Sequence, residues 1–87
     1  MKIEILGTGC YQCVRLESLI ADVLIELEIQ EADLTRVSEE QAIRRWMPLD
    51  ALPGLVINRV LASMGRLPAR EELVSWLRAA AQPAPAG

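Results

Sequence analysis

The two cysteines of this chain, Cys10 and Cys13, are the residues best suited to chemistry. They are separated by two residues and lie between a short apolar run and a long amphipathic segment. If the chain is helical from about Tyr11 onward, both sulfurs lie on one helix face and can meet. Backbone N–H groups in a first helical turn are unpaired and carry partial positive charge, which favours a thiolate at Cys10. Because the thiolate is the nucleophilic form of cysteine, the pair predicts thiol–disulfide exchange.

The composition narrows the classes of function. The chain has 87 residues, the size of one domain, and no histidine, which removes the commonest general base and metal ligand. Its formal net charge of −3 argues against nucleic acid or an anionic membrane as a partner. No window has the roughly 20 apolar residues of a membrane span, and residues 1–6 are too short for a signal peptide. We therefore expect a cytoplasmic monomer whose cysteines are redox-active or metal-binding rather than a structural bridge.

The apolar pattern predicts the elements around the cysteines. Residues 2–6 are a short strand, and residues 14–27 carry an apolar stripe at spacings of three and four, which predicts a helix. Residues 31–37 alternate loosely and indicate an edge strand. Ser38 and Gln41 fit a capping box that opens a short helix ending at Pro48.

The second half of the chain predicts a hairpin and a helix. Residues 55–57 and 60–62 are short apolar runs joined by two residues, and a final helix has Pro68 in its first turn. The resulting order is β-α-β-α-β-β-α. Its first strand, helix and second strand form a right-handed crossover unit, in which the two strands are parallel. We expect an α/β fold with a mixed four-stranded sheet and helices on both faces. Residues 1–81 form one domain, and residues 82–87 are a Pro/Ala/Gly tail that we expect to be disordered.

This arrangement resembles the thioredoxin fold. It is most similar to the small thioredoxin-like, glutaredoxin-sized redox-active disulfide proteins of bacteria and archaea. The resemblance covers roughly residues 2–81 and rests on three stretches: Ile3 to Cys13, Leu52 to Asn58, and Gly65-Arg66. The C-x-x-C motif alone is weak evidence, but its combination with a proline loop and hairpin is fairly specific.

The resemblance implies a role for each thiol and for the proline loop. Cys10 attacks a substrate disulfide, and Cys13 resolves the mixed disulfide that results. The peptide bond between Leu52 and Pro53 is implied to be cis and to face the disulfide, which leaves the Leu52 backbone free to pair with a substrate chain. The chain departs from thioredoxin proper, because its motif lacks the Trp-Cys-Gly-Pro-Cys signature, and the identity of its reductase is therefore open.

Three further residues are candidates for the site. Tyr11, between the cysteines, and Gly65, at a corner that faces the disulfide in this fold, are candidates for substrate binding. Glu4 has two interpretations: a proton acceptor for Cys13, as the resemblance implies, or a strand carboxylate that reaches water. We favour the second, because carboxylates are rarely fully buried.

Our first hypothesis is an enzyme, a protein thiol–disulfide oxidoreductase or electron carrier that needs no cofactor or metal. Its partners would be protein disulfides and a reductase, either thioredoxin reductase-like or the glutathione system. A second hypothesis is a soft-metal or metalloid-binding module that uses the same two thiols. A third is an adaptor domain that senses redox state without turnover.

Overall fold

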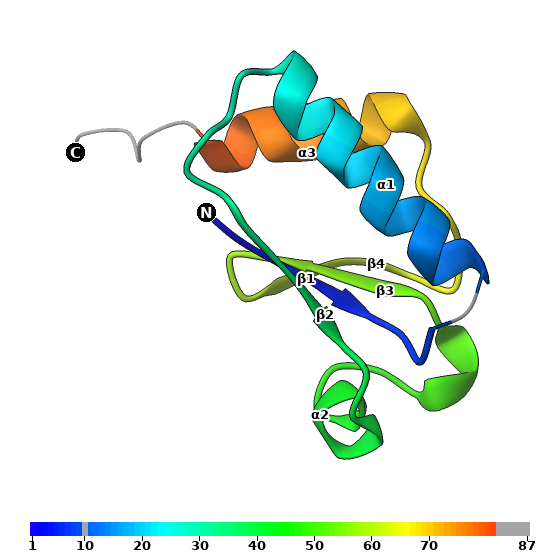
Figure 1. The fold of residues 1–87 in the computed structure, drawn as a ribbon. Coiled ribbons are helices and arrows are strands. Elements are labelled where there is room, and N and C mark those ends of the chain that lie inside the picture. Colours follow the sequence, from blue (N-terminus) through cyan, green and yellow to red (C-terminus); the bar gives the residue numbers. More distant parts are fainter. Residues whose placement is uncertain (10, 82–87) are drawn as a thin grey trace.

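The computed structural model describes residues 1–9 and 11–81 (Figure 1), so the expectations for Cys10 and for the 82–87 tail lie outside the described residues. The elements are β1 (Lys2–Leu6), α1 (Tyr11–Glu26), β2 (Asp33–Val37), α2 (Glu40–Arg44), the 3-10 helix η1 (Leu49–Ala51), β3 (Gly54–Ile57), β4 (Val60–Met64) and α3 (Arg70–Ala81). The predicted order is confirmed, and η1 is an addition within the proline loop.

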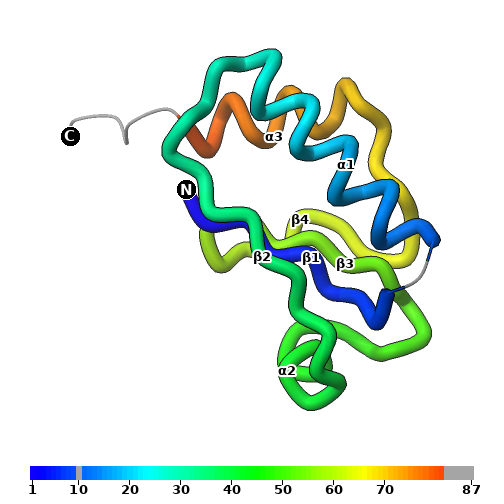
Figure 2. The backbone as a smooth tube through the Cα atoms, viewed as in Figure 1, coloured from blue at the N-terminus to red at the C-terminus, as the bar shows by residue number. Residues whose placement is uncertain are grey.

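The four strands form one sheet in the order β2-β1-β3-β4. β2 is parallel to β1, whereas β3 is antiparallel to β1 and β4 to β3. Helices α1 and α3 cover one face of the sheet and α2 lies against the other (Figures 1 and 2). This is the mixed α/β architecture that the sequence predicts. In the part of the chain that the structure describes, no helix is both long and apolar enough to span a membrane.

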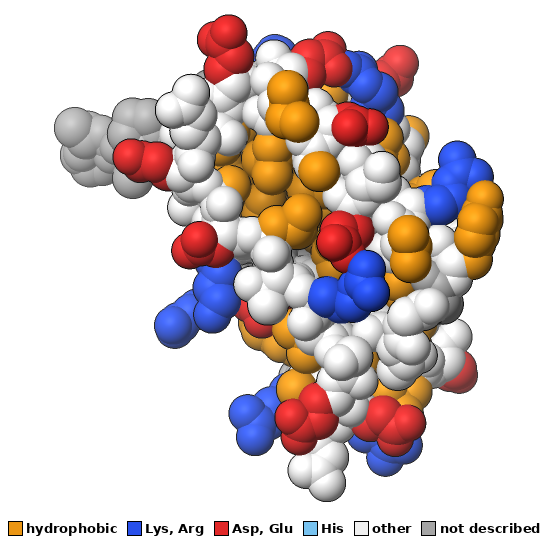
Figure 3. Space-filling model, viewed as in Figure 1, with side chains coloured by type: hydrophobic (Ala, Val, Ile, Leu, Met, Phe, Trp, Pro, Cys, Tyr) orange, Lys and Arg blue, Asp and Glu red, His pale blue; other side chains and the backbone are white. Residues whose placement is uncertain are grey.

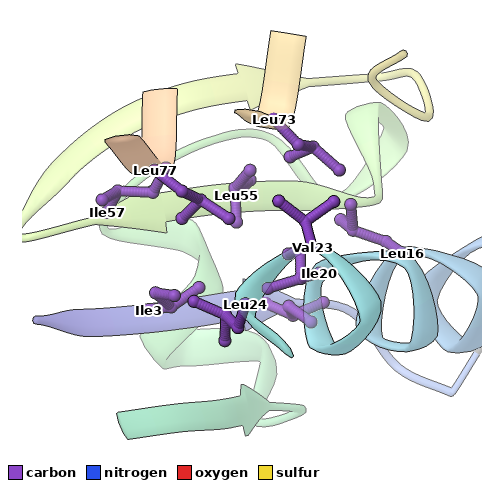
Figure 4. Close-up of a cluster of buried hydrophobic side chains, with 10 residues drawn as sticks. Ile3, Leu16, Ile20, Val23, Leu24, Leu55, Ile57, Leu73 and Leu77 are labelled. Atoms are coloured by element: carbon purple, nitrogen blue, oxygen red, sulfur yellow. The ribbon is translucent and has the colours of Figure 1, made fainter. Parts of the chain in front are cut away.

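The larger core lies between the sheet and the helix pair α1 and α3 (Figure 4). The apolar stripe of α1 supplies four buried residues, and Figure 4 shows them meeting side chains from the sheet and from α3: Leu16, Ile20, Val23 and Leu24 from α1, Ile3, Leu55 and Ile57 from the sheet, and Leu73 and Leu77 from α3. A smaller core on the other face joins α2 to the sheet through Leu6, Ile43, Met47 and Val56. The sheet is therefore anchored on both faces.

Two predicted helix starts are wrong by one or two residues. The residue that precedes α2 is Glu39 rather than Ser38, and no side chain caps this end. Burial of Ile43 against the sheet sets the position of α2, and the predicted capping box is not formed. Pro68 lies before α3 rather than in its first turn, since α3 begins at Arg70.

The hairpin between β3 and β4 turns through Asn58 and Arg59, as predicted. Both residues have positive φ angles, 49° and 66°, which is the condition for a type I′ turn. The Asn58 side chain accepts a hydrogen bond from the Lys2 backbone N–H at 2.9 Å, so the turn is tied to the start of β1.

The connection from β4 to α3 is held by a charged pair. The Arg66 guanidinium donates two hydrogen bonds to the Glu72 carboxylate, each 2.7 Å long, and the Ala69 backbone N–H donates a third at 3.1 Å. These hydrogen bonds lower the pKa of Glu72 from 4.5 to about 2. The ionised carboxylate therefore stabilises the folded chain relative to the unfolded one.

The Glu72 interaction predicts a specific loss of stability in acid. Because the folded-state pKa lies below the unfolded-state pKa, the contribution is complete above pH 4.5 and is lost as the pH falls toward 2. Glu72→Gln should be less stable than the natural protein at pH 7, and this difference should shrink toward pH 2. Glu71→Gln, which alters a neighbouring carboxylate, is the control in urea unfolding at each pH. A Glu72→Gln difference that stays constant from pH 7 to pH 2 would contradict the assignment.

The core predicts unequal effects for two isoleucines of α1. Ile20 is fully buried, whereas Ile25 is 76% exposed. Ile20→Ala should lower the free energy of unfolding by about 2–5 kcal/mol, because it removes buried apolar contacts and leaves a cavity. Ile25→Ala should change it by less than about 0.5 kcal/mol. Urea unfolding of both variants measures the contrast, and equal losses would show that α1 does not pack as described.

Candidate functional site

The strand register brings the predicted site segments to one end of the sheet. Leu6 at the end of β1 pairs with Gly54 at the start of β3, and Gly54 pairs with Met64 at the end of β4. The segments that continue from these three residues therefore leave the sheet side by side, because neighbouring strands are only about 5 Å apart. They are the loop to α1, the proline loop and the corner before α3 (Figure 1).

The proline loop is joined directly to the corner at Gly65. The peptide bond between Leu52 and Pro53 is cis, as the resemblance implies, with Pro53 buried and Leu52 partly exposed. The Gly65 backbone N–H donates a hydrogen bond to the Pro53 carbonyl at 3.1 Å. Gly65 has a φ of +78°, which favours glycine, and it is exposed. The structure thus brings these two predicted residues together.

Cys13 lies in the first turn of α1 and is fully buried. Its sulfur lies against Gly7, the residue that follows β1, so close that a Cβ at position 7 would overlap the sulfur. Leu16 and Ile20 hold the same helix face in the larger core. The Cys13 sulfur is therefore placed at the carboxyl end of β1, the edge where α/β sheets gather ligands.

Tyr11 begins α1 and is 74% exposed. The Arg15 guanidinium lies over its ring, 5.7 Å from the ring centroid. Val14 and Met64, at the same end of the molecule, are each 48% exposed. Exposed apolar side chains and one cation thus lie at the end of the molecule that carries Cys13.

Glu4 is not on the same face of the sheet as the helix that carries Cys13. Side chains alternate between the two faces along a strand, and Ile3 and Ile5 point into the core beneath α1 and α3. Glu4 therefore lies on the face that carries α2, where it is partly exposed. This position fits a carboxylate that reaches water.

Surface charge is mixed where Figure 3 shows it. On the face shown in Figure 3, acidic and basic side chains are interspersed, without one large region of a single sign. Among residues 1–9 and 11–81, no group of three or more His, Cys, Asp or Glu side chains could hold a metal ion. Neither observation suggests a nucleic-acid surface or a metal cluster in the described part.

Two residues near the site were not identified from the sequence. Gly7 was not singled out among the site residues, although its lack of a side chain admits the Cys13 sulfur. A glycine directly after a strand and six residues before a cysteine was the available signal. Arg15 is the second such residue, and its spacing of four from Tyr11 was the signal for the contact.

Comparisons with known proteins agree with this geometry. Residues 1–78 match the family model described as the thioredoxin domain. The chain is 40% identical over 73 residues to a thioredoxin of Methanothermobacter thermautotrophicus, an alignment that covers 84% of this chain and 92% of that protein. No solved structure gives a significant match. Nothing in these matches supports the soft-metal alternative. The extent of both matches shows that the chain belongs to the thioredoxin family.

Proposed function

We propose that the protein is a thiol–disulfide oxidoreductase or electron carrier that works through Cys10 and Cys13. The observation that carries this proposal is the position of the Cys13 sulfur, buried at the carboxyl end of β1 in a chain of the thioredoxin family. A thiol at that edge, three residues after a second cysteine, is suited to closing a disulfide with it. The family relationship supports exchange chemistry in general, and the assignment to these two residues is our proposal.

The reaction proceeds in two balanced exchanges. The Cys10 thiolate attacks one sulfur of a substrate disulfide, which forms a mixed disulfide and releases the other substrate sulfur as a thiolate. The Cys13 thiolate then attacks the Cys10 sulfur, which closes the Cys10–Cys13 disulfide and releases the second substrate thiolate. Water supplies protons to the released thiolates. The substrate gains two electrons and the protein loses them, so a separate reductase must return the protein to its dithiol form.

Burial of the Cys13 sulfur separates the tasks of the two thiols in this proposal. Cys13 is fully buried, so a protein substrate cannot reach its sulfur without local opening. Burial suits the resolving thiol, which needs to reach only Cys10. The nucleophilic step is therefore assigned to Cys10.

The substrate would be bound across the end of the sheet. Tyr11 and its neighbour Val14 offer exposed apolar surface on one side of the site, and Leu52, Pro53 and Gly65 form the other side. Leu52 is a partly exposed residue, and its backbone would pair with an extended substrate chain as a further strand. We therefore propose as partners proteins that present a disulfide in an extended segment, together with a reductase.

Two cysteine variants test the proposal. Cys13→Ser should accumulate a mixed disulfide through Cys10 with a disulfide-containing protein such as insulin, because the second exchange is blocked. Cys10→Ser should neither reduce insulin nor trap it. Turnover of Cys13→Ser should fall by at least about a hundredfold, since the neighbouring thiol with its high effective concentration is lost.

Mass spectrometry of the trapped species and insulin reduction by the variants provide the measurements, with dithiothreitol alone as the baseline. The double variant Cys10→Ser/Cys13→Ser is the control for background exchange. Retention of insulin reduction by Cys10→Ser, or trapping of insulin through Cys13, would refute the proposed roles.

A further inference from the structure

Gly7 and Gly9, which precede the cysteines, are needed as glycines for different reasons. Gly9 has a φ of +90°, and a Cβ built there would meet nothing within 4 Å. Glycine at position 9 is thus favoured by backbone conformation and not by lack of space. Gly7 does not have a positive φ, but a Cβ there would overlap the Cys13 sulfur and lie 3.0 Å from the Cys13 Cβ. At position 7 glycine is therefore required by the lack of space for a side chain.

Neither side of the Gly7–Cys13 contact can move away easily. The Gly7 backbone N–H donates a hydrogen bond to the Val37 carbonyl at 3.0 Å, which extends the pairing of β1 with β2 beyond the strand. On the other side, Leu16 and Ile20 are fully buried and fix the helix that carries Cys13. A side chain at position 7 would therefore have to displace the sulfur itself, because interiors are close-packed.

We propose that Gly7 is a positioning residue for Cys13: by lacking a side chain, it holds the Cys13 sulfur where it can attack the Cys10 sulfur of a mixed disulfide. The inference rests on the proposed function. In the step concerned, the Cys13–Cys10 bond forms, the Cys10–substrate bond breaks, and the substrate leaves as a thiolate. The bond length and dihedral angle of a disulfide lie in small ranges, so a displaced Cys13 sulfur reaches the alignment for attack less often.

The first test is a double-mutant cycle on the reduced proteins, which compares Gly7→Ala with the natural protein and Gly7→Ala/Cys13→Ala with Cys13→Ala. Gly7→Ala should lower the midpoint of urea unfolding, because the new methyl group and the sulfur compete for the same space. In the Cys13→Ala background the same change should shift the midpoint little, since the sulfur is absent. Gly9→Ala is the matched control, and its effect should be the same in both backgrounds.

The second test follows the exchange itself. Gly7→Ala should slow the release of substrate from the mixed disulfide by roughly one to two orders of magnitude, as expected for a displacement of about 1 Å. The first exchange, made by Cys10, should change less. The mixed disulfide should therefore accumulate during turnover of Gly7→Ala but not of the natural protein.

The outcomes separate this inference from the proposed function. An equal midpoint shift in both backgrounds, or failure of both position-7 variants to fold, would overturn the role of Gly7. If Gly7→Ala alone fails to fold and the double variant folds, the contact with the sulfur is supported. An unchanged release rate in Gly7→Ala would also overturn the inference. Absence of any exchange in the natural protein would instead refute the proposed function, while the cycle on reduced protein would still report the contact.

Discussion

The register of three strands at one end of the sheet is the constraint on which the site depends. Leu6, Gly54 and Met64 are paired in a row across β1, β3 and β4. Side-chain alternation fixes this register, because a slip of one residue would exchange the strand residues of the larger core with those of the smaller core on the other face. The loops attached to these three strand ends therefore leave the sheet side by side. The placing of Pro53 and Gly65 beside each other is thus a consequence of how the core is buried.

Glycine has two different functions along this edge. At Gly65 and Gly9 the backbone adopts a positive φ, whereas at Gly7 and Gly54 the neighbouring side chains leave no room for a Cβ. Sulfur atoms occupy the space in both crowded cases, from Cys13 at Gly7 and from Met47 at Gly54. Side chains on both faces of the sheet therefore pack closely against the same end of β1 and β3. The exposed apolar groups of the site lie at this closely packed end.

Much of this was predictable because the signals were strong and local. The apolar stripe of α1 and the short runs of the hairpin gave the elements, and the resemblance to a known fold placed the cis bond before Pro53. Helix starts were less predictable: the burial of Ile43, a tertiary effect, outweighed the cap suggested by Ser38. The face on which Glu4 lies, and the contact of Gly7 with Cys13, depend on which helix covers which side of the sheet. Sequence spacing does not contain that information.

The central claim, that Cys10 and Cys13 form a reversible disulfide, is tested most directly by a redox titration of the purified protein in glutathione and dithiothreitol buffers. The account predicts a reversible two-electron transition between roughly −300 and −120 mV, the range of known exchange proteins. The position within that range would show whether the protein mainly donates or accepts electrons. Failure to form the intramolecular disulfide at any potential would contradict the account.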